Sequence, residues 1–319
     1  MIVDNLRTAM VVVGWVVGVC QIWHGPSSTY AFAAAQKVIV VVSQDSPSTA
    51  EVLRGFRTVL ESGGVHTDLV VQNLNGNGEQ ASAVLHQFKS DPPALFLTVG
   101  SLATQALLAE HVDVPVIASL TAHLEKLQKR DNLIGVSLEF SLESQLVVMR
   151  RILPDLATVG VLYSPKENQD TIDRAGSLVK KLGLKFVAKP IEAPRDIPDT
   201  LEGLANNVDL LWGIADQVVL SPQMAEPILL FSFRNKVPLA GLSTPWVKAG
   251  ALYALERDYG DIGAQCAEMA LKILNKTNPQ ALSIVAPRKV LFSVNLKTAR
   301  VMRIELPQQI IDSASHVFQ

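Results

Sequence analysis

Short apolar runs alternate with helix-like segments along most of this sequence, and no other feature constrains the fold as strongly. The β-branched run KVIVVVS (37–43) is followed by SPSTAEVLRGFRTVLESGG (46–64), which has a helix N-cap signal in front and a glycine pair at its end. Further strand-like runs are expected at 65–74, 91–100 and 114–120, with helix-like segments after the first two. Strands joined through helices pair in parallel with right-handed crossovers, so the pattern predicts an α/β fold.

The same plan occurs a second time later in the chain. Strand-like runs at 158–164, 184–191, 208–216 and 237–243 again alternate with helix-like segments. A chain of 319 residues suits two lobes of ordinary size better than one small domain. Its hydrophobic content of 48% and mean hydropathy of +0.25 fit buried parallel strands, which are apolar along their whole length. We therefore expect two α/β lobes with a ligand cleft between them, beyond the carboxyl ends of the strands.

The first residues have the features of a secretory signal peptide. An apolar run at 9–23 follows Arg7, and its length suits a signal-peptide core better than a membrane span. Ala31-Phe32-Ala33 is a small-x-small cleavage pattern, so the mature chain is expected to begin near Ala34, in the periplasm or outside the cell. The alternative is an uncleaved anchor that tethers the protein to the membrane. Cleavage would leave Cys266 without a disulfide partner, and we expect it to be a small core residue.

Composition and motifs argue against several classes of function. The net charge is −2 and there is no basic block, which makes a nucleic-acid partner unlikely on electrostatic grounds. The sequence has no GxxxxGK[ST] phosphate loop, no GxGxxG and no HExxH. The segment 241–245 does not match the G-x-S-x-G motif of a nucleophile elbow, because proline stands in place of the last glycine. The histidines do not have the spacing of metal ligands. We therefore expect no enzyme activity, no metal and no cofactor.

Asp216 is the strongest single candidate for ligand binding, because the apolar run at 208–216 ends in this one acid. A carboxylate at the end of a parallel strand can face a cleft and accept hydrogen bonds from an ammonium or hydroxyl group. The alternative is that Asp216 caps the local turn or the next helix, although Ser221-Pro222 is itself a good N-cap and N1 pair.

The first lobe offers a different chemistry at the matching position. Gly100 lets the backbone approach a ligand, and Ser101 begins a helix whose free N–H groups favour a carboxylate or another anion. The alternative is an ordinary capped turn. The strand-end loops at 43–48, 164–169 and 241–246 are also rich in short polar side chains, which either contact a ligand or are simply solvated turn residues.

Four stretches together carry a family resemblance. They are NLIGVSLEFSLESQLVVMRRILPDLATVGVLYSPKEN, VDLLWGIADQVV, VPLAGLSTPWVKAGALYALERDYGDIGAQCAEMALKIL and VLFSVNLKTARVMRIELPQQII. These stretches resemble ABC transporter substrate-binding proteins, and most closely the group that includes tryptophan- and tyrosine-binding proteins. The resemblance covers nearly the whole mature chain and is more specific in its C-terminal half.

This resemblance implies a type I periplasmic binding protein: two Rossmann-like lobes with parallel sheets, joined by a three-crossing hinge and closing on the ligand. A monomer is the family expectation. With residues 1–33 as the signal peptide, we expect an N-terminal lobe from 34–122 and 256–283, and a C-terminal lobe from 123–255 and 284–319.

The resemblance also implies where a ligand binds. In amino-acid-binding members, hydroxyl and backbone N–H groups hold the carboxylate, and the acid after the third strand of the second lobe, here Asp216, holds the amine. Ala215-Asp216-Gln217 and Ser243-Thr244-Pro245 depart from the family's usual TDN-like and SDE-like triplets, so a related pocket for a different ligand is expected. The expected ligand-binding residues are Gln44, Asp45, Ser46, Gly100, Ser101, Ser164, Asn168, Asp216, Ser243 and Thr244.

The leading functional hypothesis is a solute-binding protein that delivers a small polar metabolite, such as an amino acid, to an ABC permease in the membrane. The alternative is a sensing module that presents a small molecule to a membrane sensor kinase. An enzyme on the same scaffold is disfavoured because no acid–base or nucleophile constellation is present. On this hypothesis, Asp216→Ala should abolish binding of an amine-bearing ligand and leave the fold intact.

Overall fold

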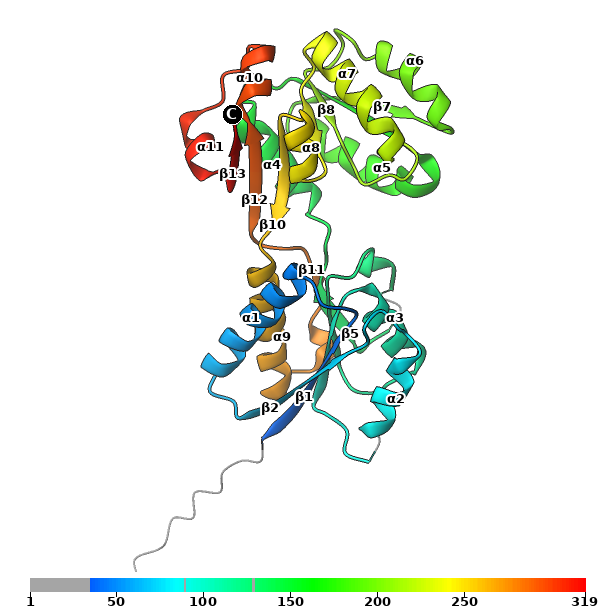
Figure 1. Cartoon of the computed structure of the whole chain (residues 1–319), viewed down its shortest axis with the longest axis vertical. Helices are drawn as coiled ribbons and strands as arrows, with labels where there is room; N and C mark the ends of the chain where they lie inside the picture. The colour runs from blue at the N-terminus through cyan, green and yellow to red at the C-terminus, as the bar shows by residue number, and fades with distance from the viewer. Residues whose placement is uncertain (1–34, 89, 128–129) are drawn as a thin grey trace, which may run out of the picture. The chain divides into compact units, whose positions relative to one another are not determined.

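The two predicted series of strands form two separate sheets (Figure 1). The computed structural model describes residues 35–88, 90–127 and 130–319. The expected signal peptide and its cleavage site therefore lie outside the described residues. Among the helices of the described part, none combines the length and the apolar character that crossing a bilayer requires.

The first sheet has six strands in the order β11-β5-β4-β3-β1-β2, and every neighbouring pair is parallel. Its strands are β1 (Gln36–Val42), β2 (Thr67–Asn73), β3 (Leu95–Val99), β4 (Val116–Ser119), β5 (Leu133–Val136) and β11 (Ile284–Val285). The helices and 3₁₀ turns of this part are α1 (Pro47–Ser62), α2 (Gln80–Gln87), α3 (Ser101–Ala109), η1 (Leu124–Leu127), α9 (Tyr259–Leu274) and η4 (Pro279–Ala281).

The second sheet has seven strands in the order β13-β12-β10-β9-β8-β6-β7, with one antiparallel pair, β10 and β12. Its strands are β6 (Thr158–Tyr163), β7 (Lys185–Pro190), β8 (Leu210–Trp212), β9 (Leu239–Gly241), β10 (Tyr253–Arg257), β12 (Val290–Asn295) and β13 (His316–Phe318). The helices and 3₁₀ turns of this part are α4 (Leu142–Ile152), α5 (Pro165–Lys181), η2 (Pro194–Asp196), α6 (Ile197–Glu202), η3 (Pro222–Met224), α7 (Ala225–Asn235), α8 (Thr244–Ala249), α10 (Leu296–Met302) and α11 (Gln308–Ser313).

Strand β1 shows why these runs become buried parallel strands. Its residues 38–42 are all 0–1% exposed. Alternate side chains pack on opposite faces: Val38, Val40 and Val42 lie in one hydrophobic cluster with α1 and α9, whereas Ile39 and Val41 lie in another with α2 and α3. Helices thus cover both faces, as an apolar run without polar alternation requires. Cys266 is buried in the first cluster, so its prediction as a core residue is confirmed.

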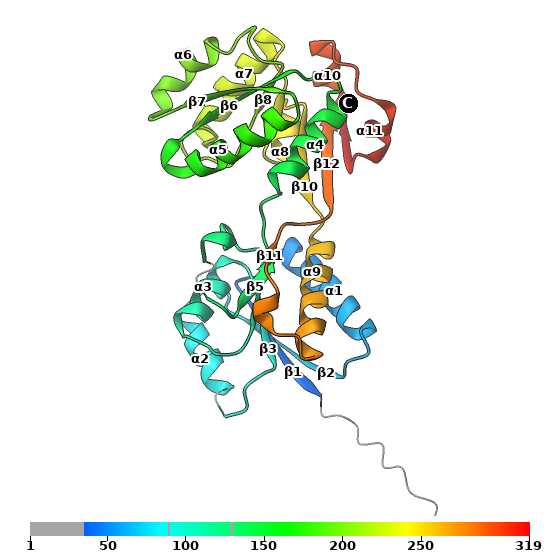
Figure 2. The same ribbon diagram turned by 180° about the vertical axis from the view of Figure 1, so that it is seen from behind.

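The chain crosses between the sheets three times, and the pairing places two of the crossings later than predicted. Strand β5 pairs with β4, so the first crossing follows Val136 and not residue 122. Strand β11 pairs with β5, so the third crossing follows Val285 and not residue 283 (Figure 2). The second crossing follows Arg257, within two residues of the predicted boundary at 255. Both overlooked strands are short, which is why no period or long apolar run marks them.

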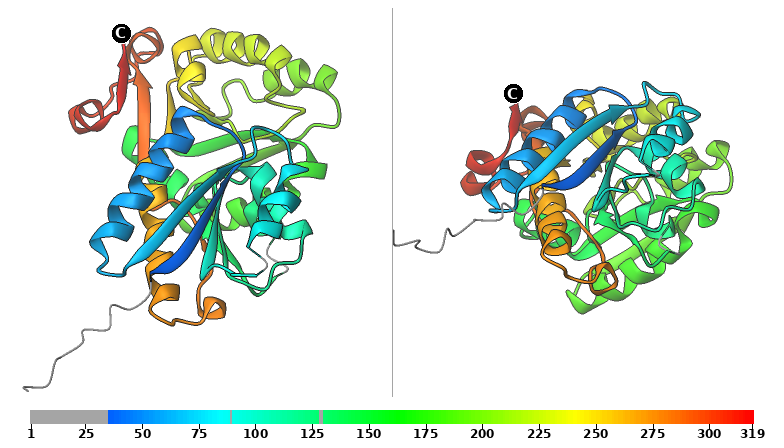
Figure 3. Two further views of the ribbon diagram at one scale, coloured as in Figure 1. Left: turned by 60° about the horizontal axis from the view of Figure 1, so that its bottom comes forward. Right: turned by 90° about the horizontal axis from the view of Figure 1, so that it is seen from below.

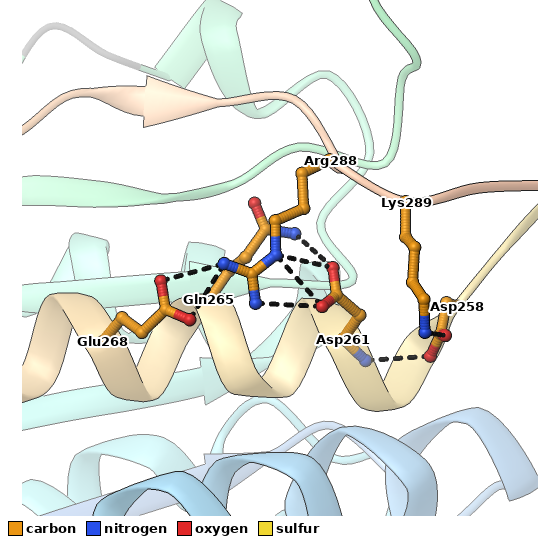
Figure 4. Close-up of polar contacts among 6 residues, drawn as sticks. All are labelled: Asp258, Asp261, Gln265, Glu268, Arg288 and Lys289. Carbon is orange, nitrogen blue, oxygen red and sulfur yellow. Dashed lines mark hydrogen bonds and ion pairs between the residues drawn. The ribbon is translucent and has the colours of Figure 1, made fainter. Parts of the chain in front are cut away.

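Charged side chains join the second and third crossings (Figure 4). Asp258 is the N-cap of α9, and its second oxygen accepts a 2.6 Å hydrogen bond from Lys289 Nζ. Arg288 binds both oxygens of Asp261 through Nε, at 3.0 and 3.1 Å, and reaches Glu268 through Nη1 at 3.0 Å. A bidentate arginine fixes direction as well as distance, so the segment before β12 is held against the first turns of α9.

The first crossing is joined to the second by Arg257. Its Nε donates a 2.6 Å hydrogen bond to the Leu138 carbonyl, and its guanidinium carbon lies 5.1 Å from the centre of the Phe140 ring. A guanidinium over an aromatic face is attracted by the ring quadrupole. The second crossing therefore contacts both of the others, and the first and third also meet directly, because the Ser137 amide donates to the Val285 carbonyl at 2.8 Å.

Helices α1 and α9 lie side by side on the first sheet, and glycines set their distance (Figure 3). A Cβ on Gly263 of α9 would lie 2.0 Å from the Val52 carbonyl oxygen of α1, which is far inside van der Waals contact. Gly55 of α1 is equally close to the Gly260 carbonyl oxygen, at 1.9 Å. These two backbones therefore touch directly, and any side chain here must separate the helices.

Replacing Gly263 by alanine should loosen this helix pair and lower the free energy of unfolding by about 1–3 kcal/mol, the usual cost of overpacking. Gly176→Ala in α5 is the matched control, because the added Cβ would meet only the Phe186 ring at 3.4 Å. That change should leave stability unchanged or raise it by about 1 kcal/mol. Thermal or urea unfolding of both variants checks the account; equal stability would contradict the tight contact.

The ion pair at Asp258 should make stability depend on pH. Burial acts to raise the pKa of Asp258, but the hydrogen bond and charge of Lys289, together with backbone hydrogen bonds from Asp261 and Gly260, more than offset it, and the pKa is lowered. Because the folded pKa lies below the unfolded value of about 3.9, this stabilisation is complete above that value and is lost as pH falls through the folded pKa.

Asp258→Asn isolates the charge, because asparagine is also a good N-cap. We expect the variant to melt below the wild type at pH 7, and the gap to narrow as pH falls below about 3.9 and to close as it passes the folded pKa. Melting curves across this range measure the gap. A gap that stays constant with pH would contradict the ion-pair contribution.

Candidate functional site

Three predicted features of the first sheet lie together where β1 and β3 end: the loop after β1, Gly100 and Ser101. These strands are parallel neighbours, so their carboxyl ends are adjacent. Gly100 has φ +102°, and a Cβ there would lie 2.4 Å from Ser43 Oγ, so only glycine fits. Ser43 Oγ in turn accepts a 2.9 Å hydrogen bond from the Ala103 amide. Ser43 was expected in the loop but not as a site residue, and it is the side chain that joins the end of β1 to the start of α3.

The first turn of α3 presents free backbone donors. The Thr104 amide bonds the Gly100 carbonyl at 3.1 Å, whereas the amides of Ser101 and Leu102 have no acceptor within residues 35–88, 90–127 and 130–319. No acid lies in the first turn of α3, nor in that of α1. The positive end of the α3 dipole is therefore uncompensated by any side chain of its own first turn.

Buried hydroxyl groups hold this helix start from beneath. Thr104 Oγ1 lies 2.8 Å from Thr98 Oγ1 and 2.7 Å from Thr121 Oγ1, and all three side chains are buried. Ser101 Oγ accepts a 3.0 Å hydrogen bond from the Ala122 amide. These contacts connect the ends of β3 and β4, so the open amides are carried on a fixed frame.

The loop after β1 is tied to α1 rather than held open. Ser46 is the N-cap of α1 and accepts from the Thr49 amide at 3.1 Å. Thr49 Oγ1 donates to the Gln44 carbonyl at 3.1 Å. The side chains of Gln44 and Asp45 are exposed. Of the three residues predicted here, Ser46 has a local structural partner, and Gln44 and Asp45 lie on the surface.

On the second sheet, Asp216 is buried and fully occupied. It is 6% exposed, and its two oxygens accept four hydrogen bonds. Oδ2 accepts from the Ser164 amide at 2.7 Å and from Asn168 Nδ2 at 2.9 Å. Oδ1 accepts from the amides of Val218 and Val219 at 3.0 and 2.9 Å. A carboxylate has about four lone-pair positions, so no position is left for a ligand in this arrangement.

The predicted residues Ser164, Asn168 and Asp216 are thus brought together, but as a link between two loops. Asn168 also donates to the Ala215 carbonyl at 3.1 Å, and Glu167 accepts from the Gln217 amide at 3.1 Å. The loop after β8 is thereby held on the first turn of α5. The expectation that Asp216→Ala leaves the fold intact does not fit these contacts, because three backbone amides would lose their acceptor.

Asp216→Asn should therefore destabilise the second lobe. The amide nitrogen would face two of the four donors, and leaving buried donors unsatisfied costs at least about 1–3 kcal/mol. Asp45→Asn is the control, because its side chain is exposed and surface changes usually stay within about 0.5 kcal/mol. Unfolding curves that coincide for the two variants would contradict the structural role of Asp216.

Thr244 has a partner that the sequence analysis overlooked. Its hydroxyl, at the start of α8, donates a hydrogen bond to Glu256 Oε1 on β10. Glu256 Oε2 accepts from Ser315 Oγ at 3.2 Å and lies 3.3 Å from His316 Nδ1. Ser243 is the N-cap of α8, but its side chain makes no capping hydrogen bond.

Glu256 is ionised more readily than an ordinary glutamate. Burial acts to raise its pKa, but the hydrogen bonds from Thr244 and Ser293, the charge of His316 and the hydrogen bond from Ser315 lower it below the ordinary value. The only sequence signal for this residue was a charge at the end of the run YALER, since its partners at 244, 315 and 316 lie elsewhere in the chain.

A surface hollow of about 650 Å³ lies at the other edge of the first sheet, at the amino ends of β4 and β5, and none of the predicted residues lines it. Three of its polar side chains are already paired: Arg130 contacts His111 at 3.1 Å, and Asn132 donates to the carbonyls of Val112 and Val114. Ligands of open α/β sheets bind beyond the carboxyl ends of the strands, so this hollow is on the wrong edge.

Two mainly parallel sheets, each covered by helices and joined by three crossings, define a type I periplasmic-binding fold. Solved structures support this assignment. A ligand-free, open substrate-binding protein with adhesive properties from Clostridium difficile superposes with a TM-score of 0.73 at 21% identity, covering 89% of this chain and 100% of that one. The ABC domain in complex with L-Trp from Streptococcus pneumonia gives a TM-score of 0.56 at 20% identity, with 89% and 100% coverage.

The sequence places the chain in a family. The family profile described as ABC transporter substrate binding protein matches residues 37–318, and the chain belongs to that family. A tyrosine-binding protein from Clostridioides difficile (strain R20291) is 24% identical over 246 residues, which are 72% of this chain and 70% of the relative. The resemblance predicted from the quoted stretches is therefore confirmed.

Proposed function

We propose that this protein is the solute-binding component of an ABC transporter, and that its ligand is a small zwitterion such as an amino acid, held between the two lobes. One observation carries the proposal: the helix starts at these edges of the two sheets differ in electrostatic character. Helix α3 begins with free amides and no acid, whereas the strand ends of the second sheet carry Glu167, Asp216 and Glu256.

The helix start of α3 suits the carboxylate of such a ligand. A helix N-terminus carries roughly half a positive charge, and its first amides point along the axis. The amides of Ser101 and Leu102 would donate to the two carboxylate oxygens, as at other anion-binding helix ends. In the second lobe, the start of α5, which follows β6, is unsuited to this role because Asp216 and Glu167 already bind around its first turn.

The second lobe would in turn hold the amine. Asp216 contributes negative charge there although its oxygens are taken, and the Thr244–Glu256 pair offers acceptors for an ammonium group. Closure of the two lobes would then bury a ligand with opposite charges at its two ends. An amino-acid ligand is supported by the relative named as a tyrosine-binding protein and by the structural neighbour solved in complex with L-Trp.

The sequence also indicates where the protein would act. Cleavage of the signal peptide near Ala34 would release the protein to the periplasm or the cell exterior. There the closed form would dock, as a monomer, on a membrane permease. Binding and release require no cofactor and no chemical step, so the ligand should be recovered unchanged.

Native mass spectrometry of the mature protein, before and after denaturation and refolding, tests for a co-purified ligand. Titration calorimetry with amino acids, their deaminated acids and their decarboxylated amines then tests the zwitterion. We expect the amino acid to bind at least about tenfold tighter than either analogue, since each hydrogen bond to a charged group is worth about 1.5–3 kcal/mol. Equal binding of an analogue, or turnover of the ligand, would overturn the proposal.

A backbone substitution tests the carboxylate end directly. Ser101→Pro removes one free amide at the first helical position, where proline is tolerated. Gly100 already has ψ 155°, which suits a residue before proline. We expect Ser101→Pro to weaken amino-acid binding by about 10- to 100-fold, the loss of a charge-assisted hydrogen bond.

Ser101→Ala is the matched control for this variant. It removes the same hydroxyl, and with it the bond from the Ala122 amide, but keeps the Ser101 amide. Affinity close to that of the wild type is expected for the alanine variant. If calorimetry shows the same loss in both variants, the hydroxyl and not the helix amide is responsible, and the proposed carboxylate site is wrong.

A further inference from the structure

Glu256 lies in the row of strand ends that the proposed ligand site uses. Strands β8, β9 and β10 are parallel neighbours, so their carboxyl ends share one edge of the second sheet. Glu256 is the last residue but one of β10. Thr244, one of the predicted ligand-binding residues, begins α8 from the same edge and hydrogen-bonds Glu256.

The two acids at this edge differ in how firmly their oxygens are held. Asp216 accepts four hydrogen bonds, and three of the donors are backbone amides that cannot turn away. The partners of Glu256 are all side chains, those of Thr244, Ser315 and His316 together with the neighbouring Ser293 hydroxyl, and no backbone amide of the described residues donates to it. These partners are side chains that can rotate, so one of them can give way to a ligand nitrogen, whereas the backbone amides around Asp216 cannot.

The surroundings of Glu256 select for a donor. The single hydroxyl proton of Thr244 is given to Glu256, so Thr244 has only lone pairs left to offer. The neighbouring cation, Arg257, already donates to the Leu138 carbonyl at 2.6 Å. The Glu256 side chain is 16% exposed, so it is within reach of solvent and partly desolvated. Ammonium and guanidinium groups carry donors and no acceptors, and they fit a set of acceptors of this kind.

We propose that Glu256, and not Asp216, accepts the cationic nitrogen of the ligand and sets the specificity for amine-bearing solutes. This role rests on the proposed function as a zwitterion-binding protein. Asp216 then has a structural task, which is to hold the loop after β8 on α5, and Glu256 supplies the charge that the ligand meets.

The test compares each of the twenty L-amino acids with the carboxylic acid that lacks its α-amino group, by titration calorimetry on the full mature protein. The wild type should prefer at least one amino acid by about tenfold or more over its deaminated acid. Glu256→Gln keeps the shape and removes the charge, and should reduce that preference by about 10- to 100-fold. Glu256→Asp keeps the charge and should restore part of it.

Glu139→Gln is the matched control. Glu139 also accepts from a serine hydroxyl, Ser137 Oγ at 2.6 Å, and lies 3.5 Å from His123 Nδ1, but it follows the first sheet. Its variant should keep the wild-type preference. A folded Glu256→Gln protein with undiminished preference, or with equal loss for amino acids and deaminated acids, would overturn the role of Glu256 alone. A wild type that binds no amino acid would overturn the proposed function, and this role with it.

Discussion

Parallel pairing of strands buried on both faces is the constraint on which the site depends. It requires a helical connection between neighbouring strands, and it brings the carboxyl ends of those strands to one edge. The loops after β1 and β3 therefore meet in the first sheet, as do those after β6, β8 and β9 in the second. Because the strands themselves are apolar, every polar group that faces a ligand must come from these loops and helix starts, or from the last residues of a strand such as β10.

The two sheets use this edge in opposite ways. In the first, the α3 helix start keeps two amides open, and Ser43 and the buried threonines hold the turn in place. In the second, the first turn of α5 is bound by Asp216 and Glu167, which removes its attraction for anions. The difference lies in side chains and not in the fold, since both lobes follow the same alternation of strand and helix. A ligand with opposite charges at its two ends matches this difference.

Most of the fold could be predicted because long β-branched runs and capped helices leave a strong local signal, as at 37–43 and 46–64. Strands β5 and β11 could not be predicted, because their four and two residues are too few to show a period. Strands that are distant in the sequence decide how they pair. For Asp216, the position at the end of a strand was predictable, but its hydrogen bonds were not. Two of its donors are the backbone amides of Val218 and Val219, and every residue except proline has such an amide, so no sequence pattern reveals these bonds. Glu256 was missed because Thr244, Ser315 and His316 reach it only after folding.

The central claim is that the ligand places a carboxylate on the start of α3, and a crystal structure of the mature protein with its bound ligand measures this most directly. The account predicts carboxylate oxygens within about 2.7–3.2 Å of the Ser101 and Leu102 amide nitrogens, the range of an ordinary hydrogen bond. A ligand bound elsewhere, or a neutral group at these amides, would contradict it.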